Sequence, residues 1–66
     1  MNTANMKLRR ERKYQNVSAL EMAKCIGIAE SSYWSKESGN RPFRQSEITV
    51  ILKKLKKPYE DVFGED

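Results

Sequence analysis

The sequence predicts a single all-α domain built from five short helices. Sixty-six residues suffice for one hydrophobic core and leave no room for a second. No stretch alternates apolar and polar residues for long, so the pattern typical of a half-buried strand is missing. Three glycines and two prolines divide the chain into five segments, and these segments carry helix start and stop signals.

The first two helices are expected before the first glycine. One covers residues 5–14, which are mostly Lys, Arg and Glu with a thin apolar face. The next begins at Ser18, whose hydroxyl stands three residues before Glu21 in the spacing of a capping box. Gly27 is placed to end this second helix in a left-handed turn.

The third helix is expected at residues 30–38, with Gly39 ending it. Pro42 then disfavours helical backbone at Arg41, which predicts a loop. A fourth helix is expected at residues 45–56, where apolar side chains recur at i, i+3, i+4 and i+7 in one stripe: Ile48, Ile51, Leu52 and Leu55.

A last short turn is expected where Pro58 suits the first helical position, before Gly64 ends it. The apolar residues of the second to fifth segments predict one core, formed by Met22, Ala23, Ile26, Ile28, Tyr33, Ile48, Ile51, Leu52, Leu55, Val62 and Phe63.

Composition argues against an enzyme, a metal site or a membrane span. The chain has no histidine, and its one cysteine, Cys25, can form neither an internal disulfide nor a zinc cage. There is no catalytic dyad and no glycine-rich phosphate loop, so we expect no cofactor. No apolar run approaches the roughly 20 residues of a membrane span, and residues 1–6 lack the apolar region of a signal peptide. We therefore expect a cytoplasmic protein.

The charge is basic and unevenly distributed. Residues 1–44 carry nine Lys or Arg against four Glu, a net charge of +5, whereas residues 45–66 carry a net charge of −1. A basic face on a small domain is suited to a polyanion such as nucleic acid. The alternative is an ordinary solvated surface that keeps the protein soluble.

The second and third helices, joined at Gly27, have the spacing of a helix-turn-helix motif. A small residue, Ala23, stands where the two helices cross, and an apolar residue, Ile28, follows the turning glycine. In proteins that use this motif on DNA, the second helix enters the major groove.

The whole chain, residues 1–66, is expected to be one helix-turn-helix domain, and residues 17–63 resemble the Cro and repressor (XRE-type) family. The block from Lys36 to Phe43 is similar to prophage and Gram-positive mobile-element members. The resemblance implies a compact five-helix, lambda-repressor-like domain. It rests on Met22-Ala23, Ile26-Gly27-Ile28, Ser32-Tyr33, Lys36-Glu37-Ser38-Gly39, Arg41-Pro42-Phe43, Glu47-Ile48, Ile51, Leu55 and Tyr59-Glu60-Asp61-Val62-Phe63.

The resemblance also implies which residues meet DNA, with the helix at residues 30–38 as the reader. The residues implied to face bases are Glu30, Ser31, Trp34 and Ser35. Those implied to contact phosphates are Lys36, Asn40, Arg41 and Arg44.

The chain departs from the family pattern at four places. Ala19 stands where a phosphate-binding glutamine is common, and Arg44 replaces the usual Ser or Thr cap of the fourth helix. The first helix lacks the apolar residue expected near Glu11. Glu30 puts a negative charge at the start of the reading helix, where it stabilises the helix dipole or accepts a hydrogen bond from a cytosine amino group.

Two functions follow from the resemblance. The first is a Cro-like transcription regulator that binds operator DNA, as a homodimer, in a bacterial host cell. The alternative is an antirepressor that binds a partner repressor protein and blocks its reading helix. Trp34 bears on the choice, since an outward indole is able to pack against DNA, anchor a protein partner or pack within the domain.

Overall fold

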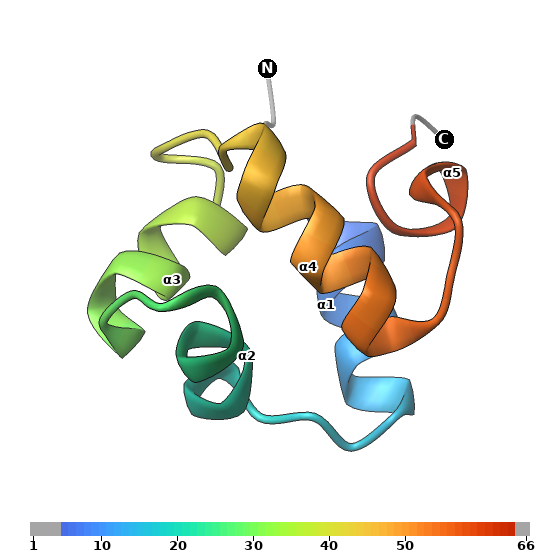
Figure 1. Ribbon diagram of the computed structural model, residues 1–66, viewed down its shortest axis with the longest axis horizontal. Helices are drawn as coiled ribbons and strands as arrows, with labels where there is room; N and C mark the ends of the chain where they lie inside the picture. Colours follow the sequence, from blue (N-terminus) through green and yellow to red (C-terminus); the bar gives the residue numbers. More distant parts are fainter. Residues whose placement is uncertain (1–4, 65–66) are drawn as a thin grey trace.

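The computed structural model describes residues 5–64, and this part of the chain forms five α-helices and no strand. The helices are α1 (Met6–Tyr14), α2 (Ala19–Ile26), α3 (Glu30–Glu37), α4 (Gln45–Leu55) and α5 (Tyr59–Val62). In Figure 1, α2 and α3 lie on one side, α4 crosses the centre with α1 behind it, and α5 lies on the other side. The predicted all-α architecture of five helices is confirmed.

The helix ends follow the local signals in the sequence. The Ser18 hydroxyl accepts a 3.0 Å hydrogen bond from the backbone N–H of Glu21, and Gly27 ends α2 with φ = 77°. Only half of the expected capping box forms, because the Glu21 carboxylate binds Lys54 Nζ at 2.8 Å instead. Pro58 is the residue before α5 and not its first helical residue, so that expectation was wrong by one position.

The core lies where α1, α2, α3, α4 and α5 converge. Six of the eleven predicted core residues are fully buried: Met22, Ala23, Tyr33, Ile51, Leu55 and Val62. The other five are only partly buried, namely Ile26, Ile28, Ile48, Leu52 and Phe63. The core also contains Leu8, Val17 and Ala19, which the prediction omitted. These three come from the first helix and the entry to the second, where the apolar pattern is thin.

The first helix is held to the rest of the fold by polar contacts as well as by Leu8. The backbone N–H of Asn5 donates to Glu37 O at 2.9 Å, and its side-chain amide donates to Lys36 O at 2.8 Å. At the other end, the Gln15 amide donates to Leu55 O at 2.8 Å. These bonds satisfy carbonyl groups at the C-terminal ends of α3 and α4, which helices otherwise leave without partners.

Candidate nucleic-acid interface

The turn between α2 and α3 presents α3 on one side of the molecule. The backbone N–H of Ile28 donates to Ala23 O at 3.0 Å, which closes the turn directly after the left-handed Gly27. A Cβ atom at Gly27 would meet nothing within 4 Å, so its positive φ, and not crowding, favours glycine there. Together, α2, the turn and α3 form the predicted helix-turn-helix.

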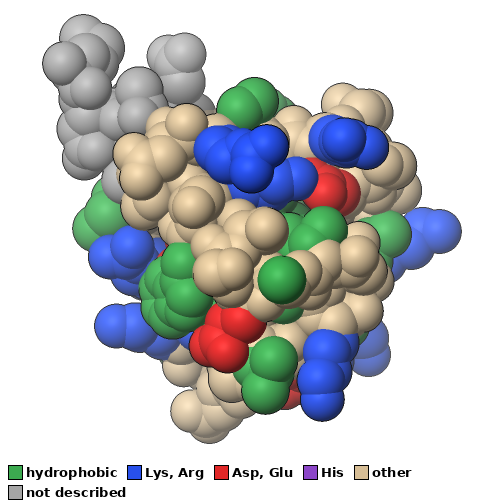
Figure 2. All heavy atoms as spheres, turned by 90° about the vertical axis from the view of Figure 1, so that its left-hand side faces the viewer, with side chains coloured by type: hydrophobic (Ala, Val, Ile, Leu, Met, Phe, Trp, Pro, Cys, Tyr) green, Lys and Arg blue, Asp and Glu red, His purple; other side chains and the backbone are tan. Residues whose placement is uncertain are grey.

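α3 has one buried face and one outward face. Tyr33, Lys36 and Glu37 point into the protein. Because successive helix residues are about 100° apart, the opposite face of α3 is formed by Ser31 and Ser35. Ser38, the half-buried residue after the last turn, continues it, and its hydroxyl donates to Ser35 O at 3.1 Å. The middle of this side of the molecule is mostly uncharged but includes acidic side chains, and basic side chains lie mainly around its edge (Figure 2). Ser38 was not among the predicted residues, although its spacing from Ser31 was a signal for it.

The predicted base-facing residues occupy different parts of this surface. Glu30 and Ser31 are exposed in the first turn of α3, and Ser35 is half-buried. The Ser35 carbonyl accepts hydrogen bonds from the backbone N–H groups of Asn40 and Arg41, at 2.9 and 3.2 Å. Ser35 therefore links the outward face of α3 to the loop that follows it.

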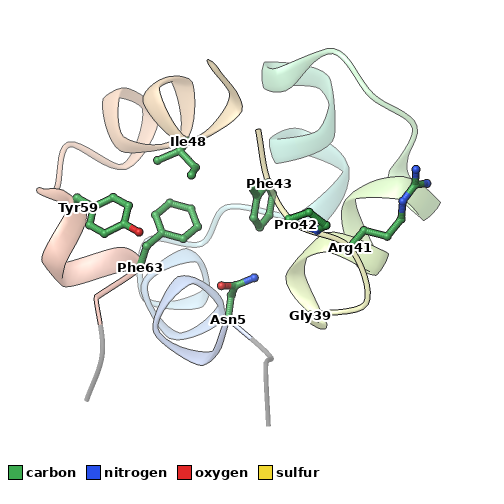
Figure 3. A pocket seen from close by; sticks show the side chains of 8 residues that line it. All are labelled: Asn5, Gly39, Arg41, Pro42, Phe43, Ile48, Tyr59 and Phe63. Carbon is green, nitrogen blue, oxygen red and sulfur yellow. The ribbon is translucent and has the colours of Figure 1, made fainter. Parts of the chain in front are cut away.

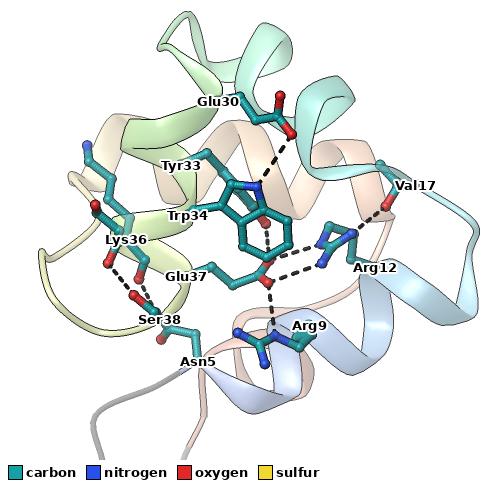
Figure 4. A network of polar contacts seen from close by, with 11 residues as sticks. Asn5, Arg9, Arg12, Val17, Glu30, Tyr33, Trp34, Lys36, Glu37 and Ser38 are labelled. Carbon is teal, nitrogen blue, oxygen red and sulfur yellow. Dashed lines mark hydrogen bonds and ion pairs between the residues drawn. The ribbon is translucent and has the colours of Figure 1, made fainter.

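Trp34 lies at the edge of this face, against α1. Its side chain is 42% exposed, and the guanidinium carbon of Arg12 lies 5.4 Å from the centre of the indole ring. Its Nε1 donates to a carboxylate oxygen of Glu30 at 3.4 Å, and its ring meets the edge of Tyr33 (Figure 4). The indole thus has partners within the domain on three sides.

A buried ion pair connects α1 to α3 beneath Trp34. The Glu37 carboxylate accepts hydrogen bonds from Nε and Nη2 of Arg12 at 2.9 and 3.1 Å, and from Nε of Arg9 at 3.1 Å. The Tyr33 hydroxyl donates to the same carboxylate, and Arg12 Nη1 donates to Val17 O at 3.0 Å (Figure 4). Arg12 fills the place near Glu11 where an apolar residue was expected.

The charges in this cluster stabilise one another. Burial opposes the charge of Glu37, but the hydrogen bonds from Arg12 and Tyr33 outweigh it and lower the pKa of the carboxyl group. Burial and the neighbouring Glu37 carboxylate raise the pKa of the Tyr33 hydroxyl well above its ordinary value. The cluster therefore holds a neutral tyrosine, an ionised glutamate and two guanidinium groups at neutral pH.

The predicted phosphate contacts divide into three exposed residues and one buried residue. Asn40, Arg41 and Arg44 are exposed on the loop between α3 and α4. Lys36 is 8% exposed, and its Nζ donates to both carboxylate oxygens of Glu47 at 2.6 and 2.7 Å. Lys36 is thus a structural residue, since its ammonium group is already neutralised inside the fold.

Glu47 also determines how the loop enters α4. Its carboxylate accepts a 2.8 Å hydrogen bond from the backbone N–H of Arg44, the residue before the helix. Arg44 cannot return a side-chain cap, because a guanidinium group has no acceptor. A hollow of about 340 Å³ lies beside this entry to α4, and its polar lining comprises Ser32, Lys36, Arg41, Arg44, Ser46 and Glu47.

A second hollow of about 340 Å³ lies between this loop, α4 and α5. Its lining is about equally apolar and polar: Phe43, Ile48, Tyr59 and Phe63 supply apolar side chains, and Asn5 and Arg41 supply polar ones (Figure 3). The rings of Phe43 and Phe63 are 5.6 Å apart, and Tyr59 remains 51% exposed.

Residues 5–64 contain no group of three His, Cys, Asp or Glu side chains placed to hold a metal ion. Across the same residues, no helix is both long enough and apolar enough to cross a membrane.

The fold is similar to that of a solved protein. The crystal structure of the restriction-modification controller protein C.AhdI from Aeromonas hydrophila superposes with a TM-score of 0.77, covers 89% of each chain and shares 22% sequence identity. At this identity the likeness establishes the fold alone. No protein-family model and no curated protein sequence matches the chain.

Proposed function

We propose that the chain is a sequence-specific transcription regulator that binds double-stranded DNA and reads the major groove with α3. The observation that carries this proposal is the outward face of α3. Its exposed first turn and its row of serines lie beside Arg41 and Arg44, which have no ion-pair partner among residues 5–64. The C.AhdI controller shares the fold, and the sequence resemblance over residues 17–63 favours a Cro-like repressor of a prophage or mobile element in a bacterial cytoplasm.

The chemistry of this face suits a DNA duplex. Serine hydroxyl groups both donate and accept hydrogen bonds at base edges. Guanidinium groups form bidentate hydrogen bonds with phosphate oxygens. Arg41 and Arg44 lie on the loop at the edge of the reading surface. Phosphates line the two sides of a groove, so side chains that contact them are expected at this edge. Asn40 adds a third polar side chain on the same loop.

We further propose that the protein binds DNA as a homodimer. One domain of this size covers few base pairs, and two copies on half-sites about one helical turn apart bind more specifically. The hollow beside α5 offers a second copy the exposed Tyr59 ring together with the Phe43 and Phe63 rings.

Selection from a pool of random duplexes of about 30 base pairs, enough for two half-sites, tests the function. We expect a selected sequence with two related half-sites, and an affinity that falls steeply as salt rises, because phosphate contacts release counterions. Equal binding of all duplexes, or no complex at low salt, would refute the proposal.

The exposed carboxylate of Glu30 favours a second candidate, an antirepressor that binds the basic reading helix of a partner repressor. Trp34 supports the antirepressor less well than Glu30 does. Its indole already packs on Arg12 and donates to Glu30, so less of it is available to anchor a partner protein. A pull-down with the repressor of the same genetic element distinguishes the two functions. Capture of that repressor without selection of a DNA sequence would establish the antirepressor.

A further inference from the structure

Glu30 and Trp34 lie one turn apart on α3 and are joined by a hydrogen bond. Trp34 Nε1 donates to Glu30 Oε2 at 3.4 Å, while Oε1 of the same carboxylate has no hydrogen-bond partner among residues 5–64 (Figure 4). Glu30 is exposed in the first turn of α3, at the end that would lead into a groove. Oε2 of Glu30 is thus bonded to Trp34, and Oε1 is available to accept a hydrogen bond from a ligand.

The indole that holds Glu30 rests on a rigid base. Its face lies 5.4 Å from the guanidinium carbon of Arg12, and its ring meets Tyr33 at 6.3 Å between centres. Arg12 is 5% exposed and is itself fixed by bonds to Glu37 and Val17. Because the indole packs on fixed groups, its N–H direction is set by the core and not by solvent.

A glutamate side chain normally samples many rotamers, and ordering it on binding costs entropy. A carboxylate already oriented by a fixed donor avoids part of that cost and discriminates more sharply between partners. The 3.4 Å bond from Trp34 therefore favours the rotamers of Glu30 that turn one carboxylate oxygen toward the indole and leave the other toward solvent.

We propose that Glu30 selects cytosine at one position of each half-site and that Trp34 is the positioning residue that holds it. This inference rests on the proposed function. An ionised carboxylate only accepts hydrogen bonds, and cytosine presents an amino donor in the major groove. Guanine presents two acceptors in the major groove, which repel the carboxylate of Glu30. Thymine presents an acceptor and a methyl group, so it offers Glu30 no hydrogen-bond donor.

Adenine is the nearest competitor, because its amino donor stands beside the N7 acceptor. A carboxylate oxygen beside that N7 would be repelled, whereas cytosine carries only a C–H group at C5 on the corresponding side of its amino group. The negative charge of Glu30 also weakens attraction to phosphates on every sequence, so a matched amino donor must offset that repulsion. Glu30 thus lowers affinity for DNA in general and restores it at the correct base.

The test is duplex selection with three variants, each first checked by thermal melting. Trp34→Phe keeps an aromatic ring over Arg12 but removes the N–H donor. Glu30→Gln keeps the size of the side chain and adds an amide donor. Glu60→Gln is the matched control, because it removes one exposed negative charge on α5, away from α3.

We expect the wild type to prefer cytosine over the other bases by roughly tenfold at one position per half-site. Glu30→Gln should change that preference to adenine, since an amide pairs with both the amino group and N7 of adenine. Trp34→Phe should reduce the preference for cytosine at that position only, and Glu60→Gln should leave the selected sequence unchanged.

The outcomes separate this inference from the proposed function. If the wild type selects a sequence and Glu30→Gln selects the same one, Glu30 reads no base and the inference fails while DNA recognition stands. If only Glu30→Gln changes the preference and Trp34→Phe does not, the positioning role of Trp34 is wrong. If the wild type selects no sequence, both proposals fail together.

Discussion

The guanidinium of Arg12 and the carboxylate of Glu37, 25 residues apart in sequence, form a bidentate ion pair in the interior between α1 and α3. Neither side chain is more than 6% exposed. Two parallel N–H···O bonds of this kind give both strength and a defined orientation. The pair fixes α3, which carries the candidate DNA-reading face, against α1.

Replacing Arg12 should be severely destabilising. Arg12→Met leaves the Glu37 carboxylate buried without its main partner, and we expect the free energy of unfolding to fall by about 3–5 kcal/mol. Denaturant unfolding measures it. Arg10→Met, on the exposed side of the same helix, is the control and should change stability by less than about 0.5 kcal/mol. Equal effects of the two substitutions would show that the ion pair contributes nothing specific.

Stability should decrease in acid because of Glu37 and Glu47. Hydrogen bonds from Arg12 and from Lys36, respectively, lower the pKa of the two carboxyl groups below the ordinary value of 4.5, despite the opposing effect of burial. A folded pKa below the unfolded one contributes stability above pH 4.5, and this stability is lost as the pH falls through the folded pKa. The melting temperature should therefore be nearly constant from neutral pH to about pH 5 and then fall.

The comparison for this pH dependence is Glu37→Gln, which removes one titrating group. Its melting temperature should be lower at neutral pH and less sensitive to acid than that of the wild type. Glu60→Gln, with an exposed side chain, should follow the wild-type profile. A Glu37→Gln protein with the full wild-type acid dependence would contradict the assignment.

The two central residues of the α4 stripe should differ in their contribution to the core. Ile51 is fully buried, whereas Leu52 is only partly buried. We expect Ile51→Ala to cost about 2–5 kcal/mol and Leu52→Ala clearly less. Chemical denaturation of both variants decides the matter, and a larger loss at Leu52 would place the centre of the core elsewhere.

The basic residues around the loop should separate into phosphate contacts and a structural residue. Arg41→Ala and Arg44→Ala should weaken binding to all duplexes and reduce the slope of log affinity against log salt by about 1 for each contact. Lys36→Met should instead lower the melting temperature, because it leaves Glu47 without its buried partner. A reduced salt slope in Lys36→Met at unchanged stability would restore Lys36 to the interface.

The oligomeric state should depend on Tyr59. Tyr59→Ser removes the exposed aromatic ring at the rim of the hollow beside α5, and we expect sedimentation to shift toward the monomer, with weaker binding to paired half-sites. Tyr14→Ser is the control, since Tyr14 is 82% exposed at the end of α1, away from the hollow. A monomeric wild type that binds an asymmetric site one to one would exclude the dimer.

The positions of the helices and of the turn were predictable from the sequence. The Ser18 cap, the left-handed Gly27, Pro42 and the apolar stripe of α4 each act on neighbouring residues through backbone geometry or periodicity. Such signals need no knowledge of the rest of the fold. The exposure of Glu30, Ser31, Arg41 and Arg44 also agreed with the expected arrangement, although their roles on DNA remain predictions.

The partners of the charged side chains were not predictable. Charged residues are almost never fully buried unless they are paired, so Arg12, Lys36 and Glu37 resembled ordinary surface residues in the sequence. Their partners are brought to them by helix packing, across 25 residues for Arg12 and 11 for Lys36.

By itself, therefore, the sequence determined the helix-turn-helix and the order of its helices, because caps, glycine turns and periodicity are local. Only the tertiary structure decided that Lys36 lies inside and that Trp34 packs on Arg12 and holds Glu30. The reason is physical: the end of a long side chain lies several bonds from its backbone. Where that end settles depends on which helix packs beside it.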